Sequence, residues 1–247
     1  FSLLSGGAGK HNYFHWLFDV LPRLAILENA KNVKKPDYYL VPSLKHPYQQ
    51  QTLKKLNIPF SKLLNGTTIK HISSNKLFIS DHPYVFNNDP SKSILHIPDW
   101  IISWLKVKFK TIKHSKKKYS KKIFIDRADS SFSKTRYIIN EKEVKFYLKE
   151  IGFKTIVLSN LTFNEQIRVF QNAETIIGLH GAGFANLIFS KAGTKVIELQ
   201  SSSSGNVIKN LAKSCKLNYK KMAIKSKNKK FILGQGNIFI DINKLRK

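Results

Sequence analysis

The sequence predicts an α/β protein with parallel sheets, because short apolar strands alternate with amphipathic helices along the chain. The alternation is most regular in the second half, where the spacing is typical of a doubly wound sheet. A lysine-rich stretch of low complexity, residues 113–122, lies between the halves. We place the domain boundary there and expect domains at residues 1–115 and 116–247.

The first half is predicted mainly from its helices. Residues 12–30 show helical spacing of apolar side chains, and Pro22 should bend or restart that helix. Asp99 is a suitable N-cap for a helix over 100–110. The other expected elements are a strand at 37–42, a helix at 46–56, one or two strands within 67–80 and a loop-rich stretch at 83–98.

The second half repeats a strand followed by a helix. Asn140 should cap one helix, whose first residues include acids that suit its amino end. Thr162 or Asn164 should cap the next. The expected strands lie at 122–126, 155–158, 175–177, 195–197, 218–222 and 237–242, with a short helix at 184–190 and a longer one at 207–215.

The charge of the chain suits an anionic partner. The 247 residues carry a formal net charge of +28, nearly all of it from lysine. Nucleic acid, a membrane surface or an acidic glycan would fit this charge, and so would the compositional bias of an AT-rich genome. Arginine and aromatic residues form no stripe of the kind that reads bases. We therefore expect no specific nucleic acid partner, while the lysine-rich surface suits peripheral membrane association.

Cysteine usage and hydropathy exclude several classes. The one cysteine, Cys215, excludes an internal disulfide framework and a multi-cysteine metal site. No stretch approaches the ~20 apolar residues of a membrane-spanning helix. A single cysteine suits a reducing compartment, and with the heavy lysine content it leads us to expect a microbial or viral cytoplasmic enzyme.

Residues 175–199 contain the strongest functional signal. A predicted strand ends in the glycine-rich loop 178–183, which opens a short helix. Ligands of open α/β sheets bind beyond the carboxyl ends of strands, and free N–H groups at the start of a helix favour phosphate. Glu198 is expected at the carboxyl end of the next strand, where it would accept hydrogen bonds from sugar hydroxyls. The stretch predicts a nucleotide or nucleotide-sugar site.

A second signal lies in the first predicted helix. His11, His15 and Asp19 are spaced four residues apart and should share one face. The set suits acid–base chemistry, with Asp19 orienting His15 or receiving its proton. It is also a plausible set of metal ligands, and it is equally compatible with a polar face at the edge of a domain.

Three segments, taken in order, resemble glycosyltransferase family 61. They are NYFHWLFDVLPRL at 12–24, RADSSFSKTRYIINEKEV at 127–144 and GLHGAGFANLIF at 178–189, followed by VIEL at 196–199. The family includes bacterial capsular polysaccharide biosynthesis proteins, plant xylosyl- and arabinosyltransferases and animal protein O-GlcNAc transferases. The resemblance extends over residues 11–200.

The resemblance implies two facing Rossmann-like domains of the GT-B type. The first predicted domain is short for this arrangement, so we expect it to be truncated, with further strands upstream of Phe1. It implies transfer with inversion from a nucleotide-sugar, expected to be a UDP-sugar, to a glycan or polysaccharide acceptor. Neither a metal nor another cofactor would be obligatory. The first domain would serve the acceptor, and the second would bind the donor.

The resemblance also suggests roles for individual residues. Cations and loop N–H groups would stabilise the departing diphosphate, His180 would donate to a phosphate and Glu198 would hold the ribose. Asn186 would contact the donor or hold the loop in shape. The donor-binding set is Arg127, Arg136, His180, Gly181, Ala182, Gly183, Asn186 and Glu198.

For the catalytic base that deprotonates the acceptor, Asp19 is the first choice and His15 the second. Two other functions stay open on the sequence alone. One is a polyanion-binding module, whose binding would weaken with salt. The other is a family member that has lost catalysis.

Overall fold

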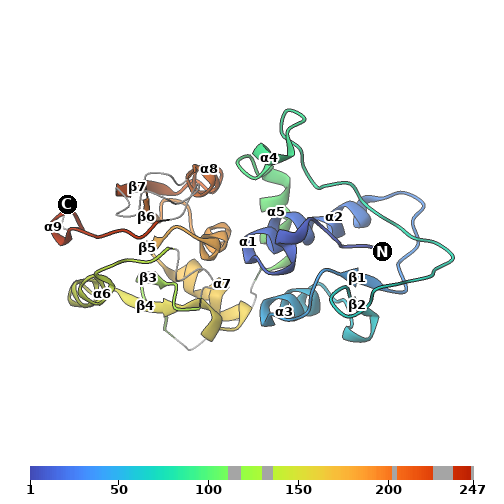
Figure 1. Ribbon diagram of the computed structural model, residues 1–247, viewed down its shortest axis with the longest axis horizontal. Helices are drawn as coiled ribbons and strands as arrows, with labels where there is room; N and C mark the ends of the chain where they lie inside the picture. Colours follow the sequence, from blue (N-terminus) through green and yellow to red (C-terminus); the bar gives the residue numbers. More distant parts are fainter. Residues whose placement is uncertain (111–117, 130–135, 202–204, 225–235, 246–247) are drawn as a thin grey trace. The chain divides into compact units, whose positions relative to one another are not determined.

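The computed structural model describes residues 1–110, 118–129, 136–201, 205–224 and 236–245 (Figure 1). The chain divides into two compact units, Phe1–Lys110 and Thr111–Lys247. Each contains parallel strands, so the predicted α/β class is confirmed. Among the described residues, no helix has the length and apolar character needed to cross a membrane.

The second unit is built on a parallel five-stranded sheet. The strands lie in the order β4-β3-β5-β6-β7. They are β3 (Lys122–Asp126), β4 (Lys154–Val157), β5 (Thr175–Leu179), β6 (Lys195–Ser201) and β7 (Asn218–Ile224). The strand order therefore reverses between β3 and β5, the first and third strands of this unit along the chain.

Helices cover both faces of this sheet, as a doubly wound arrangement requires (Figure 1). One face packs against α6 (Glu141–Glu150), whose Val144 and Leu148 join a buried cluster with Phe124 and Ile177. On the other lie α7 (Phe163–Asn172), α8 (Val207–Ser214) and the 3-10 helix η5 (Ala182–Phe189). Thr162 and Glu165 form the capping box of α7, which confirms Thr162 as the predicted cap.

The first unit has a smaller sheet. Strand β1 (Tyr39–Val41) pairs in parallel with β2 (Leu63–Asn65), and Ser2 bridges to both Leu40 and Ile79. Its helices are α1 (Tyr13–His15), α2 (Pro22–Asn29), α3 (Pro47–Lys55), α4 (Pro90–Ser93) and α5 (Asp99–Lys108), with short 3-10 helices η1 (Gly7–Lys10) and η3 (Phe60–Lys62).

A π-helical turn, η2 (Trp16–Val20), separates α1 from α2 within the predicted helix. The Leu21 N–H donates to the Trp16 carbonyl at 3.1 Å, which spans five residues. Pro22 occupies the first turn of α2, where its missing N–H is not needed. Pro22 therefore restarts the helix, and the wider turn before it carries Asp19.

Three sequence expectations were wrong. The strands expected within 67–80 reduce to the single bridge at Ile79, because 70–76 is a polar, exposed stretch with no apolar face to bury. Asp99 is the first residue of α5 and Pro98 is its N-cap. In place of a strand at 237–242, Ile238 forms one bridge with Ile138, and α9 (Ile242–Leu245) follows.

Candidate functional site

In the second unit, site residues gather where the strand order reverses. Arg127 directly follows β3, and His180 directly follows β5, its neighbour in the sheet. Parallel strands place their carboxyl ends at one edge, and the point of reversal leaves a crevice where open α/β sheets bind ligands. The topology thus brings together residues that are 53 apart in the chain.

Two guanidinium groups meet at one backbone oxygen in this crevice. Arg127 and Arg136 both donate from Nη1 to the His180 carbonyl, Arg136 at 3.1 Å. Burial is the main cause that lowers the pKa of Arg127 to about 10, and the neighbouring charge of Arg136 contributes to this shift. Burial also lowers the pKa of Arg136, whose Nε is buried without an acceptor among the described residues. Two adjacent guanidinium cations, one of which has an unpaired Nε donor among the described residues, favour an anion.

The glycine loop adds backbone donors beside these cations. Within the described residues, the N–H groups of Gly181, Ala182 and Gly183 have no acceptor. A Cβ on Gly181 would lie 2.1 Å from Arg127 Nη1, and one on Gly183 would lie 2.7 Å from Leu158. Glycine at 181 is therefore what lets the guanidinium reach the His180 carbonyl. The structure brings the predicted loop and both predicted arginines together.

The buried carboxylate of Asp126 fixes the backbone at the start of this group of residues. Asp126 accepts from the Ala128 N–H at 2.9 Å and pairs with Lys145 at 2.7 Å, which fixes the start of the loop that carries Arg127. A cleft beside the arginine pair is lined by Arg127, Arg136 and Glu141 together with Phe124, Ile138 and Leu179.

Glu198 differs from its predicted placement. It lies in the middle of β6, which continues to Ser201, and its side chain is 0% exposed. One carboxylate oxygen contacts His180 Nδ1 and the other accepts from the Tyr219 hydroxyl. Burial and this bond raise the pKa of Tyr219. With both oxygens occupied, Glu198 orients His180, and the expected direct contact with ribose is not supported.

His180 and Asn186 have distinct positions in the loop. A carboxylate only accepts, so Glu198 keeps a proton on His180 Nδ1, and Nε2 donates only in the doubly protonated ring. Nε2 has no partner among the described residues. Asn186 is 0% exposed and donates to Gln166 Oε1 at 3.1 Å. Of the two roles expected for Asn186, the structure therefore supports the one of holding the loop in shape.

In the first unit, His15 and Asp19 form a second cluster. His15 Nδ1 lies 2.5 Å from Asp19 Oδ2, and the buried Tyr84 hydroxyl donates to Asp19 Oδ1 at 2.8 Å. Burial raises the pKa of Tyr84, and Asp19 adds to the rise, so Tyr84 stays a donor. His82 Nε2 lies 3.9 Å from the same oxygen. The imidazole Nε2 of His15 has no partner in the described part of the chain.

The buried side chain of Arg23 stabilises this cluster through hydrogen bonds to the backbone. It is 6% exposed, and it donates to the Asp19 carbonyl at 3.1 Å and to the Ser80 carbonyl at 2.7 Å. These bonds connect the π-helical turn to the segment that leads to Tyr84. The predicted pairing of His15 with Asp19 is therefore present, with a supporting framework that the spacing did not indicate.

The third residue of the predicted helix face lies elsewhere. His11 precedes α1, and its ring centroid lies 5.9 Å from that of His46. Within the described residues, no three His, Cys, Asp or Glu side chains are placed to hold a metal ion.

Four contributors were missed from the sequence: Arg23, Tyr84, Gln166 and Tyr219. Tyr84 is 65 residues from Asp19, and Tyr219 is 21 residues from Glu198. Nothing in their local sequence marks them. Only Arg23, within the family-like segment 12–24, gave a signal that could have been used.

We predict that Gly181→Ala weakens binding of inorganic pyrophosphate about tenfold, because the new methyl group displaces Arg127. Isothermal titration calorimetry measures the affinity. Gly205→Ala is the control, since a Cβ there meets nothing within 4 Å. Equal affinities for the two variants would show that the contact of Arg127 with the loop plays no part in anion binding.

Comparison with known proteins identifies the family. The glycosyltransferase 61 model matches residues 13–197, a stretch that contains both clusters except Glu198, Tyr219 and the end of β6. Over 107 residues the chain is 29% identical to the EGF domain-specific O-linked N-acetylglucosamine transferase of Gallus gallus. That match covers 41% of this chain and 20% of the relative, so the aligned part is about a fifth of the relative's length. The chain belongs to the glycosyltransferase 61 family.

Proposed function

We propose that the protein is a glycosyltransferase that moves a sugar from a nucleotide-sugar, expected to be a UDP-sugar, to a hydroxyl group of a glycan or polysaccharide. Family membership supports glycosyl transfer, and the named relative transfers N-acetylglucosamine. The observation that carries the proposal is the pair of adjacent cations, Arg127 and Arg136, beside a loop whose N–H groups have no acceptor within the described part of the chain.

The arginine pair suits the diphosphate of the donor. Cleavage of the bond from the sugar C1 to the diphosphate leaves negative charge on the leaving oxygen. Preorganised cations and N–H groups stabilise such charge without reorganising during the reaction. We propose that Arg127, Arg136 and the loop 181–183 do this without an obligatory metal. His180, once doubly protonated, would add a donor from Nε2.

His15 suits the role of the base better than Asp19, which reverses the order expected from the sequence. Both oxygens of Asp19 already accept hydrogen bonds, from His15 and from Tyr84. Asp19 keeps a proton on His15 Nδ1, so the neutral ring presents Nε2 as an acceptor. The His15 side chain is 24% exposed and that of Asp19 is 13% exposed. His15 therefore receives the proton, and Asp19 orients the ring and stabilises its charge.

The proposed reaction is a single displacement. The acceptor oxygen gives its proton to His15 Nε2 and forms a bond to C1 of the sugar. The bond from C1 to the diphosphate breaks on the opposite face, and its electron pair stays with the nucleoside diphosphate. One displacement of this kind inverts the configuration at C1.

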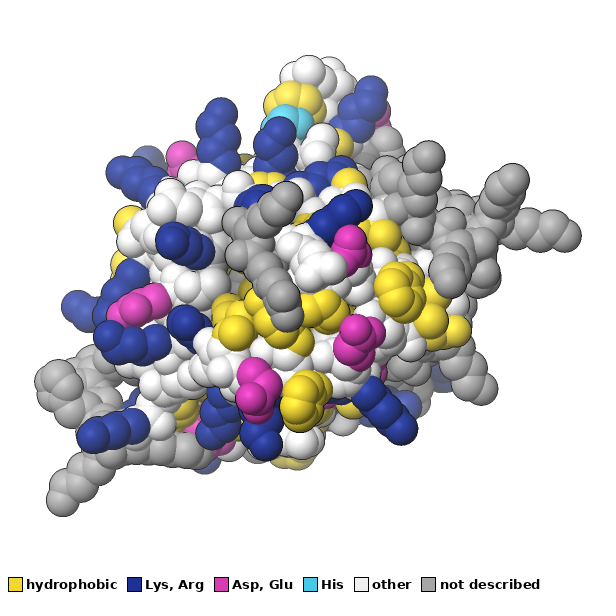
Figure 2. All heavy atoms as spheres, turned by 90° about the vertical axis from the view of Figure 1, so that its left-hand side faces the viewer, with side chains coloured by type: hydrophobic (Ala, Val, Ile, Leu, Met, Phe, Trp, Pro, Cys, Tyr) yellow, Lys and Arg dark blue, Asp and Glu magenta, His cyan; other side chains and the backbone are white. Residues whose placement is uncertain are grey.

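The distribution of charge gives less support to a polyanion-binding module. On the face that Figure 2 shows, basic side chains are spread among acidic and apolar ones and form no continuous stripe. A net charge of +28 still favours anions in general. Peripheral association with an anionic membrane therefore stays a prediction.

A thermal-shift panel of UDP, GDP, CMP, ADP and NAD tests the donor. We expect one nucleoside diphosphate, UDP, to stabilise the protein in the presence of EDTA. At 100 times its dissociation constant it should add about 2.7 kcal/mol to the free energy of unfolding. If no nucleotide stabilises the protein while DNA does so in a salt-dependent way, the polyanion-binding function would replace the present proposal.

The role of His15 predicts a separation of binding from turnover. His15→Gln should lower the rate of sugar transfer from UDP-N-acetylglucosamine, measured as the UDP formed, by at least about 100-fold, because the base is lost. Its affinity for UDP should stay unchanged. The control is His71→Gln, at an exposed residue of the same unit. Full activity of His15→Gln, or a parallel loss of UDP affinity, would contradict the assignment.

A further inference from the structure

The C-terminal strap, residues 237–240, pairs with the segment 137–140 that directly follows Arg136. The Ile238 N–H donates to the Tyr137 carbonyl at 3.1 Å, and the Ile139 N–H donates to the Ile238 carbonyl at 2.8 Å. The two segments are 100 residues apart in the chain. Two backbone bonds alone would make this a minimal bridge.

Two asparagine side chains extend the bridge at its ends. Asn140 Nδ2 donates to the Ile240 carbonyl at 2.8 Å, and the Ile240 N–H donates to Asn140 Oδ1 at 3.0 Å. At the other end, Asn237 Oδ1 accepts from the Tyr137 N–H at 3.3 Å. A side-chain amide offers a donor and an acceptor much as a peptide group does. Five hydrogen bonds thus join the strap to 137–140.

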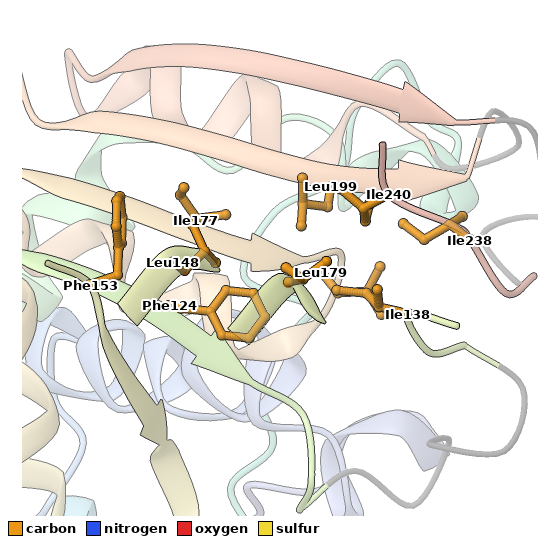
Figure 3. Packing of buried hydrophobic residues seen from close by; sticks show 10 residues of the cluster. Phe124, Ile138, Leu148, Phe153, Ile177, Leu179, Leu199, Ile238 and Ile240 are labelled. Carbon is orange, nitrogen blue, oxygen red and sulfur yellow. The ribbon is translucent and has the colours of Figure 1, made fainter. Parts of the chain in front are cut away.

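Buried isoleucines fix the strap to the sheet. Ile238 and Ile240 are fully buried, and Ile138 is nearly so. Figure 3 shows these three side chains beside Leu179 and Leu199, near the carboxyl ends of β5 and β6. Two kinds of contact therefore fix the segment 137–140. The buried side chain of Ile138 packs into the core, and the backbone is hydrogen-bonded to the strap.

Arg136 needs such support because burial disfavours its charge and lowers its pKa, although the nearby Glu198 carboxylate acts in the opposite direction. Its guanidinium shares the His180 carbonyl with Arg127, so two like charges lie side by side in a half-buried site. Repulsion between them favours a conformation in which one side chain turns toward water. Because the backbone at Tyr137 is fixed, the adjacent Arg136 has less freedom to turn its side chain toward water.

We propose that the C-terminal strap is a structural part of the anion site, in which Asn140 and Asn237 are positioning residues that hold Arg136 beside Arg127. The inference rests on the proposed function in taking the anion to be the diphosphate of the donor. It makes phosphate binding at the ends of β3 and β5 dependent on residues 237–240, which lie just before α9.

A double-mutant cycle with inorganic pyrophosphate tests the proposal. Asn140→Ala should weaken pyrophosphate binding at least threefold in the wild-type background, because Asn140 and Arg136 are expected to be energetically coupled. In an Arg136→Ala background the same change should have no effect, because the residue through which it acts is gone. Glu143→Ala is the control, since it removes the other hydrogen bond of Asn140 and leaves the strap bonds in place. Equal weakening in both backgrounds, or in neither, would overturn the proposal.

A second measurement does not depend on ligand binding. Phenylglyoxal modification, mapped to Arg136 by mass spectrometry, should be faster in Asn140→Ala than in the wild type. An unchanged rate would overturn the strap's role. If the wild type binds no pyrophosphate, the proposed function fails while this assay still decides the role of the strap. If Asn140→Ala does not fold, Asn237→Ala, which removes a single hydrogen bond, serves in both experiments.

Discussion

Two positive charges that share one carbonyl oxygen are the constraint around which the second unit is built. Arg127 and Arg136 both donate to His180, and burial lowers the pKa of each guanidinium. Such an arrangement costs stability in the absence of a ligand, as functional sites often do. Its supports are the glycine at 181, which leaves room for Arg127, and the strap, which fixes the backbone after Arg136. An anion that bridges the cations would relieve their repulsion.

Each unit also contains a carboxylate whose two oxygens both have hydrogen-bond partners. Asp19 is bonded to His15 and Tyr84, as Glu198 in the second unit is bonded to His180 and Tyr219. Each carboxylate fixes the tautomer of a histidine and leaves Nε2 available. In the proposed reaction one histidine accepts a proton from the acceptor and the other serves the departing phosphate.

The sequence predicted those features that are local or that follow from parallel topology. Alternation of strands and helices indicated the sheet, and strand ends followed by Arg127 and by a glycine loop indicated residues at one edge. Contacts set by long-range register were not predictable: Tyr219 meets Glu198 only because β7 pairs with β6 in the observed register. The prediction of a strand at 237–242 was wrong for a related reason. Much of its pairing comes from asparagine side chains, which in a sequence resemble turn residues.

The affinity of UDP for Arg127→Gln, compared with that for Lys149→Gln, tests the central claim most directly. Both changes remove one positive charge, but Lys149 is an exposed residue near the end of α6. If the arginine pair binds the donor diphosphate, Arg127→Gln should lose at least about tenfold in affinity, or ~1.4 kcal/mol, while Lys149→Gln stays within about twofold of wild type. Equal losses would show that affinity follows net charge alone, and would contradict a defined phosphate site at the ends of β3 and β5.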